Sequence, residues 1–168
     1  FRNFPDMSQT LDTQIDHSMV DDNALKSLQE IPMRCGGCGA KVGSTVLRRV
    51  IERLKQNYKN KSDGTEGIIL GLDQPDDAAV INVPEGKLLV QSLDYFKSFI
   101  RDPYLLGRIS ANHALGDLFA MGATPHSALA LVTLPFSLEK LLEEELYQIM
   151  SGALKEIHQN NMTLVGGH

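Results

Sequence analysis

The sequence predicts an α+β domain in which a mixed or antiparallel sheet is covered by helices on one face. Three observations support this class. Stretches with apolar residues at helical spacing alternate with short apolar runs that are bounded by turn residues. Of the 168 residues, 42% are hydrophobic, which is enough for a core. The expected order is a leading helix followed by strand, strand, strand, helix, strand, helix and strand, without an internal repeat.

The leading helix is expected to begin at Ser44, a suitable cap, and to continue to about Lys55. Its apolar residues fall on one face, which consists of Val46, Leu47, Val50, Ile51 and Leu54. Charged residues occupy the opposite face, namely Arg48, Arg49, Glu52, Arg53 and Lys55. We interpret that charged face as solvated in preference to a binding patch.

Three strands are expected next, over Ile68–Leu72, Ala78–Val83 and Leu88–Leu93. The sequence Pro84-Glu85-Gly86 between the last two is typical of a tight turn. These two strands are therefore predicted to form a hairpin.

The second half of the chain predicts two longer helices. Asp102 and Pro103 favour a helix start, and Gly122 favours its end after about Met121. Further elements are expected over Ser127–Leu134 as a buried strand, from Ser137 to about Asn160 as an amphipathic helix, and over Met162–Val165 as a strand.

Residues 1–32 are polar and acidic and have no sustained apolar period, which predicts a flexible tail or an interdomain linker. An arm that packs on a partner is the alternative. The domain proper is expected over residues 33–168. The chain starts at Phe1 and ends on a loop-like glycine pair followed by His168, so we expect it to be part of a longer protein.

Composition excludes several classes of protein. The formal net charge of −5 argues against a nucleic-acid binder with a broad basic surface. No window approaches the run of about 20 apolar residues that a membrane helix needs, so no membrane partner is expected. Two cysteines are too few for a disulfide scaffold, which favours a reducing compartment, the cytoplasm.

The glycine-rich segment from Cys35 to Gly43 matches neither the P-loop nor the dinucleotide pattern. Its glycines permit close backbone approach to a ligand, and Lys41 could close over a phosphate. The pair Cys35 and Cys38 lacks the further ligands of a zinc site and the preceding strand of a thioredoxin motif. Two interpretations stay open for these cysteines, an inert loop pair and a reactive nucleophile beside Lys41.

Four acidic residues stand at element boundaries or in apolar surroundings. Asp76 and Asp77 precede a predicted strand, Asp94 follows another, and Asp117 interrupts an apolar helical stretch. An unpaired carboxylate is costly in apolar surroundings, and Mg²⁺ bound to a nucleoside triphosphate takes one or two carboxylates. Together with Lys41, these residues favour a magnesium–nucleotide site.

Several segments, in this order and spacing, resemble the N-terminal half of the selenophosphate synthetase (selenide, water dikinase) family, within the aminoimidazole ribonucleotide synthetase-like superfamily. The resemblance covers Met33 to His168. The matching segments are Gly37-Cys38-Gly39-Ala40-Lys41, Asp76-Asp77-Ala78-Ala79-Val80, Asp94-Tyr95-Phe96, Gly107-Arg108-Ile109, Asn112 with Asp117-Leu118-Phe119-Ala120-Met121-Gly122, and Gly166-Gly167-His168. The acidic segments mark the superfamily, and the cysteine and lysine mark the selenium branch.

The resemblance implies a role for each matched residue. Cys38 corresponds to the active-site cysteine and Lys41 to a catalytic lysine that contacts ATP. Asp77 and Asp117 correspond to magnesium ligands, Asp117 also lying near the nucleotide. The remaining ATP-site positions implied are Gln74, Pro75, Asp76, Asp94, Gly167 and His168, the last two in a glycine turn.

The implied reaction forms selenophosphate, AMP and phosphate from ATP, selenide and water, with Mg²⁺ as cofactor. The implied fold pairs the sheets of two chains into a barrel, which predicts a homodimer. The family's C-terminal domain supplies another magnesium-binding aspartate, so we expect this segment alone to be inactive. Ala40 stands where many bacterial relatives have a cysteine. The Cys-Gly-Gly-Cys form resembles versions fused behind a flavoprotein oxidoreductase, which would be a further partner domain.

Two alternatives stay open. One is a sister enzyme that uses ATP, of the aminoimidazole ribonucleotide synthetase or thiamine-monophosphate kinase type. Cys38 and Lys41 argue against it, because neither reaction needs a thiol in that segment. The other is a non-catalytic dimerising module that binds a nucleotide or a metal.

Overall fold

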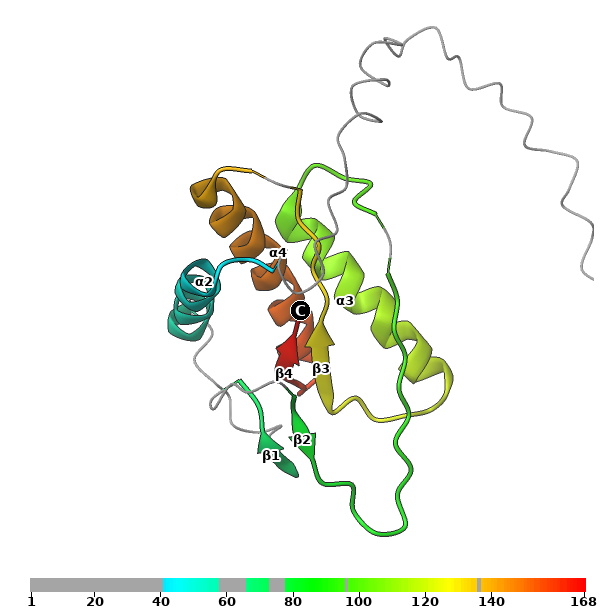
Figure 1. The fold of residues 1–168 in the computed structure, drawn as a ribbon. Coiled ribbons are helices and arrows are strands. Elements are labelled where there is room, and N and C mark those ends of the chain that lie inside the picture. Colours follow the sequence, from blue (N-terminus) through cyan, green and yellow to red (C-terminus); the bar gives the residue numbers. More distant parts are fainter. Residues whose placement is uncertain (1–40, 58–65, 73–77, 96, 136) are drawn as a thin grey trace, which may run out of the picture. The chain divides into compact units, whose positions relative to one another are not determined.

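The computed structural model of the chain describes residues 41–57, 66–72, 78–95, 97–135 and 137–168. All of them lie in one compact unit, Gly37–His168. The elements are α2 (Ser44–Asn57), β1 (Ile68–Leu70), β2 (Val80–Ile81), α3 (Pro103–Ala120), β3 (Ser127–Ala130), α4 (Glu139–Gln159) and β4 (Thr163–Gly167), as Figure 1 shows. The predicted α+β class is confirmed, and the predicted tail lies outside the described residues.

The strands form two small sheets and not the single mixed or antiparallel sheet that was predicted. Within the described residues, β1 pairs antiparallel with β2, and β3 pairs parallel with β4. Parallel neighbours need a long crossover, and α4 supplies it between β3 and β4. The parallel ladder aligns Ser127 with Thr163 and Ala130 with Gly167.

The predicted hairpin between Ala78–Val83 and Leu88–Leu93 is wrong. Its turn is present, since the Lys87 amide donates to the Pro84 carbonyl at 3.1 Å. However, β2 pairs with β1, and residues 87–95 form no strand. Because a strand needs a partner for its backbone groups, apolar alternation alone did not produce one here. The side chains of this segment remain open to solvent, and Leu88 is 93% exposed.

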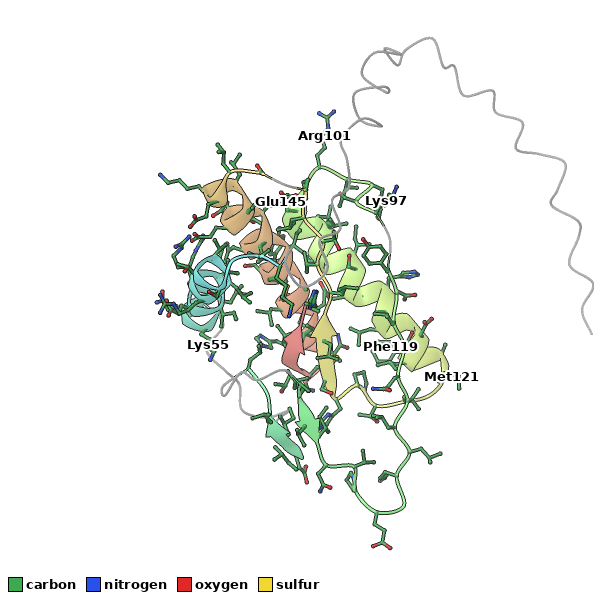
Figure 2. The ribbon with its side chains drawn as sticks, in the orientation of Figure 1. Lys55, Lys97, Arg101, Phe119, Met121 and Glu145 are labelled. Atoms are coloured by element: carbon green, nitrogen blue, oxygen red, sulfur yellow. The ribbon has the colours of Figure 1, made fainter. Side chains whose placement is uncertain are left out.

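The predicted α3 is confirmed at both ends. The Asp102 carboxylate accepts a hydrogen bond from the Leu105 amide at 2.9 Å, and Pro103 occupies the first turn. Met121 caps the other end, and Gly122 adopts φ +67°. Two apolar residues at this end do not reach the core. Figure 2 shows Phe119 and Met121 at the C-terminal end of α3, where both are exposed.

The core lies where α2 and α4 meet. Val46, Val50 and Leu54 of α2 are buried, as predicted, whereas Leu47 is exposed. The other members of the core come mainly from α4 and β4, and they are Leu115, Leu146, Met150, Leu154, Ile157, Met162 and Leu164. The helix α4 begins at Glu139, two residues later than predicted, because Leu138 has extended backbone angles.

Helices α3 and α4 cross at a pair of glycines. A Cβ atom at Gly107 would lie 1.9 Å from the Ile149 carbonyl oxygen, and one at Gly152 would lie 1.9 Å from the Tyr104 carbonyl oxygen. Real Cβ atoms do not approach backbone this closely, so both positions require glycine. Beside this crossing, the Arg108 Nε donates to the buried Glu156 carboxylate at 2.6 Å, and this contact raises the pKa of Arg108.

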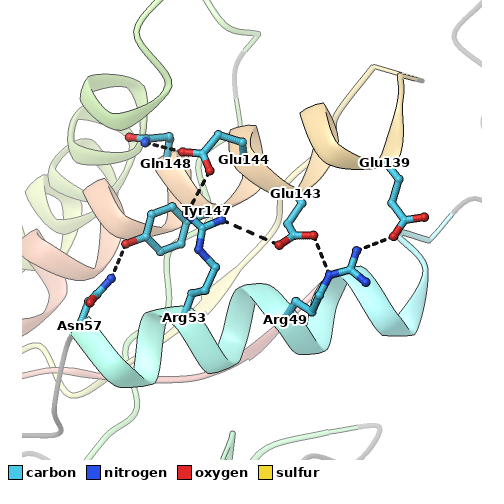
Figure 3. Close-up of polar contacts among 8 residues, drawn as sticks. All are labelled: Arg49, Arg53, Asn57, Glu139, Glu143, Glu144, Tyr147 and Gln148. Atoms are coloured by element: carbon cyan, nitrogen blue, oxygen red, sulfur yellow. Dashed lines mark hydrogen bonds and ion pairs between the residues drawn. The ribbon is translucent and has the colours of Figure 1, made fainter.

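A ladder of polar contacts joins α2 to α4, and Figure 3 shows its members. Arg49 binds Glu139, and its Nε donates to Glu143 at 2.7 Å. One turn on, Arg53 pairs with Glu144 at 3.0 Å and its guanidinium lies 3.7 Å from the centroid of the Tyr147 ring. A further turn on, Asn57 donates to the Tyr147 hydroxyl at 2.6 Å.

The ladder corrects the interpretation of the charged face of α2 as merely solvated. The contact partners follow one another in the same order along both helices, so α2 and α4 run in the same direction. The hydrogen bonds that Arg49 donates to Glu139 and Glu143 raise the pKa of Arg49. Hydrogen bonds from Gln148 and then Arg53 lower the pKa of Glu144.

We expect Arg53→Gln to lower the free energy of unfolding by about 1 kcal/mol, since the pairs are partly exposed. Arg48→Gln, on an exposed part of the same helix, is the control and is expected to change little. Urea unfolding at low and high salt measures both. Because the lowered pKa of Glu144 means that its stabilisation is present above its unfolded-state pKa, the effect of Arg53→Gln should shrink as acid protonates the carboxylates. An effect that is independent of salt and pH would contradict an ionic origin.

No helix within the described ranges is long and apolar enough to cross a membrane.

Candidate active site

The structure describes five of the predicted site residues. They are Lys41, Asp94, Asp117, Gly167 and His168. The other predicted positions lie outside the described residues, and they are Cys38, Gln74, Pro75, Asp76 and Asp77.

The two described acids, Asp94 and Asp117, come from segments that lie side by side. Residues 82–95 and 97–101 run past α3 in the opposite direction, as Figure 1 shows. Ser92 Oγ donates to Asp117 Oδ2 at 2.6 Å, and His113 Nε2 lies 4.0 Å from Asp94 Oδ2. The fold thus brings together the two segments that carry these acids, which are 23 positions apart in the sequence.

The surroundings of Asp117 are not apolar, contrary to the expectation from its neighbours in the sequence. It is exposed on α3, so burial imposes no cost on its charge. Within the described residues, its carboxylate accepts a hydrogen bond from the hydroxyl of Ser92, which engages one of the two oxygens. The other oxygen remains available to a ligand that approaches from solvent.

Asp94 is the more constrained of the two acids. Its side chain is 27% exposed, but Oδ2 is buried and has no hydrogen-bond partner among the described residues. The His113 ring nitrogen Nε2 lies 4.0 Å from this oxygen, a distance longer than a hydrogen bond. A buried carboxylate oxygen without a donor is costly, which indicates that this atom is suited to a cation or a donating ligand.

These carboxylates fit magnesium bound to a nucleotide. Magnesium takes oxygen ligands only and commonly uses one or two carboxylates with phosphate oxygens and water. Asp94 offers a buried free oxygen, and Asp117 offers an exposed one. Among the described residues, no three acidic, histidine or cysteine side chains form a cluster that could hold a metal without further oxygen ligands.

Lys41 lies three residues before α2. Its side chain is exposed, and the Gly43 carbonyl accepts the first helical hydrogen bond from Leu47 at 3.0 Å. The buried face of α2 and the ladder to α4 hold this helix, so the position of the backbone near Lys41 is set by the same contacts.

Gly167 and His168 form a strand end and not the predicted turn. Gly167 is the last residue of β4, which extends two residues beyond the predicted strand. The His168 amide donates to the Ala130 carbonyl at 2.7 Å, and the Val132 amide donates to the His168 carbonyl at 2.9 Å. A Cβ atom at Gly167 would lie 2.0 Å from the Ala130 oxygen, so the ladder with β3 requires glycine there.

Sequence reasoning missed Ser92 and His113. A signal was available, because His113 and Asp117 are four residues apart on a predicted helix and therefore share a face. Ser92 and Asp94 are two residues apart in an extended segment and share a side in the same way. Nothing in the sequence indicated that these two faces would meet.

The chain is similar in sequence to known proteins. The family model described as "AIR synthase related protein, N-terminal domain" matches residues 75–168. Curated relatives named selenide, water dikinase include those of Nitratidesulfovibrio vulgaris strain DP4, 37% identical over 80% of this chain, and Agathobacter rectalis, 38% identical over 79%. The chain spans 37% and 36% of the length of these relatives.

A solved structure gives the same fold. Thiamine-monophosphate kinase from Stenotrophomonas maltophilia K279a superimposes with a TM-score of 0.55 and 24% sequence identity, over 70% of this chain and 36% of that one. The family model covers more than half of the chain and includes both acids, Asp94 and Asp117. The chain therefore belongs to the family of AIR synthase related proteins, and residues 75–168 match its N-terminal domain.

Proposed function

We propose that the chain provides the ATP- and magnesium-binding domain of an enzyme that makes selenophosphate from ATP, selenide and water, with release of AMP and phosphate. The observation that carries this proposal is the 36–38% identity, over about four fifths of the chain, to proteins named selenide, water dikinase. Membership of the family, the unpartnered buried oxygen of Asp94 and the exposed carboxylate of Asp117 support the nucleotide and metal parts of the proposal.

In this proposal, Asp117 and Asp77 bind Mg²⁺, and Asp94 faces the metal–nucleotide. Magnesium, when bound, neutralises phosphate oxygens and polarises the phosphoryl group that is transferred. Lys41 places a point charge beside the phosphates, for which its exposed position three residues before α2 is suited. The remaining residues that would line the ATP site are Gln74, Pro75, Asp76, Gly167 and His168.

Cys38 is the residue proposed to hold the selenide. It is three residues from Lys41, whose positive charge would favour the thiolate. If the lysine closes over the ATP phosphates, the cysteine moves toward the reacting phosphoryl group with it.

The active unit is proposed to be a homodimer of the full-length protein, whose further C-terminal domain completes the magnesium site. The extended segment after β2 exposes Leu88, Leu89 and Leu93, and no strand within the described residues pairs with it. A second copy would cover this apolar edge. Sedimentation velocity of the full-length protein tests the pairing. The compartment proposed from the low cysteine content is the cytoplasm.

The test of the proposed function is the identity of the product. We expect the full-length protein to form selenophosphate and AMP from ATP and selenide under anaerobic conditions, detected by ³¹P NMR. Cys38→Ser should lose most of this activity, and Cys35→Ser should lose much less. Formation of ADP with thiamine monophosphate as acceptor, without selenophosphate, would assign the chain to the sister enzyme instead.

A further inference from the structure

The contact between α3 and the extended segment before it has a matched register. His113 and Asp117 are one helical turn apart on α3, a spacing of about 6 Å. Ser92 and Asp94 are two residues apart in extended backbone, a spacing of about 6.6 Å. Because the spacings match, Ser92 can contact Asp117 while Asp94 lies near His113. Leu93, between Ser92 and Asp94, is exposed.

The bond from Ser92 to Asp117 is of the strong kind. Its length of 2.6 Å lies in the range of a hydroxyl bonded to an ionised carboxylate. A carboxylate can only accept, so the hydroxyl of Ser92 is the donor. Asp117 is exposed and would otherwise sample several rotamers. The bond engages Oδ2 and leaves Oδ1 for a ligand that approaches from solvent.

The same segment carries Asp94, whose buried Oδ2 has no hydrogen-bond partner among the described residues. Displacement of the segment from α3 would move this oxygen away from Asp117. Ser92 is thus the group that ties the backbone of one acid to the side chain of the other.

We propose that Ser92 is a positioning residue that sets Asp117 and Asp94 in the arrangement that receives magnesium and the nucleotide phosphates. This inference rests on the proposed function for the identity of the ligand and extends it to a residue outside the predicted set of site residues. The hydroxyl acts through Asp117, so a hydroxyl at this position, and not the serine backbone, is the required feature.

The experiment measures Mn²⁺ binding, as a probe for magnesium, to the full-length protein with a non-hydrolysable ATP analogue and without selenide. Electron paramagnetic resonance reports free Mn²⁺, so no turnover is involved. Threonine and valine have the same shape and differ in the hydroxyl. We therefore expect Ser92→Thr to bind Mn²⁺ within about twofold of the wild type and Ser92→Val to bind about tenfold more weakly, the loss typical of one bond to a charged group.

Ser98→Ala is the matched control. Ser98 lies on the same segment, and its hydroxyl donates to the Ile100 carbonyl at 2.8 Å, away from the acids. We expect its Mn²⁺ affinity to equal that of the wild type. Melting temperatures of all variants should agree, because Ser92 is exposed and its loss removes no core contact.

Three results would overturn the proposal: equal affinities for the threonine and valine variants, an equal loss in Ser98→Ala, or a wild type that binds no Mn²⁺ with the analogue. Failure of the proposed function is a separate result. If the wild type makes no selenophosphate but the threonine and valine variants still differ in Mn²⁺ affinity, Ser92 positions the acids and the substrate has been misassigned. If selenophosphate forms and the affinities agree, the reaction stands and Ser92 has no positioning role.

Discussion

Gly152→Ala is expected to lower the free energy of unfolding by about 3 kcal/mol, at the upper end of the range for overpacked cores. The new methyl group would meet the Tyr104 carbonyl oxygen at 1.9 Å and the Arg108 amide nitrogen at 3.0 Å. These are backbone atoms of α3, so no side-chain rotation relieves the clash. The two helices must move apart, and contacts along the whole crossing weaken.

Gly107→Ala should have a similar effect, because its methyl group would meet the Ile149 carbonyl oxygen of α4 at the same distance. The double variant should lose less than the sum of the two, since the separation that relieves one clash also relieves the other. Gly116→Ala on α3 is the control. Nothing lies within 4 Å of its added methyl group, so higher helix propensity should stabilise the protein by up to about 1 kcal/mol.

Urea unfolding of the four proteins beside the wild type measures these changes. Equal stability of Gly152→Ala and Gly116→Ala would contradict the close crossing of α3 and α4. The crossing also matters for the candidate site, because α3 carries His113 and Asp117 within the three turns that follow Gly107 and Arg108. A shift of α3 would therefore change the contacts to Ser92 and Asp94.

The features that depend on local sequence alone were predicted well. Asp102, Pro103 and Gly122 each satisfy a backbone requirement of their own position, so the ends of α3 follow from the residues there. The buried face of α2 follows in the same way from the helical spacing of Val46 and Val50.

Elements that depend on distant partners were predicted less well. Leu88–Leu93 has the composition of a strand, but pairing decides whether a strand forms, and β2 pairs with β1. Arg49 and Arg53 were assigned to solvent because the acids of α4 that bind them are about 90 residues away. The spacing of Gly107 and Gly152 gave no indication that these glycines face each other.

The same distinction applies to the candidate site, where the sequence identified residues but not the contacts between them. Asp94 and Asp117 were identified by their residue type and neighbours, and through the family resemblance. Their proximity, and the contacts of Ser92 and His113, are tertiary facts that no single segment encodes. The burial expected for Asp117 was wrong, because apolar neighbours along a helix point in several directions while one face stays open to solvent.

The largest expected effect on activity is that of Asp117→Asn in the full-length protein. We expect metal-dependent ATP consumption to fall by more than about a hundredfold, since loss of a group that only supports a metal ligand typically costs ten- to a hundredfold. The amide keeps the size of the carboxylate and one acceptor oxygen, so the bond from Ser92 can persist. The charge that attracts Mg²⁺ is lost, whereas the packing of α3 is unchanged.

Stability should therefore not fall with activity. Removal of one of two neighbouring negative charges relieves repulsion in the metal-free protein, so the melting temperature of Asp117→Asn should equal or exceed that of the wild type. Asp102→Asn is the matched control, because it removes an acid from the start of the same helix while asparagine retains the N-cap. It should consume ATP at the wild-type rate. Phosphate and AMP release at saturating Mg²⁺ measure activity, and differential scanning fluorimetry measures stability. ATP consumption by Asp117→Asn at the wild-type rate would show that Asp117 is not a metal ligand.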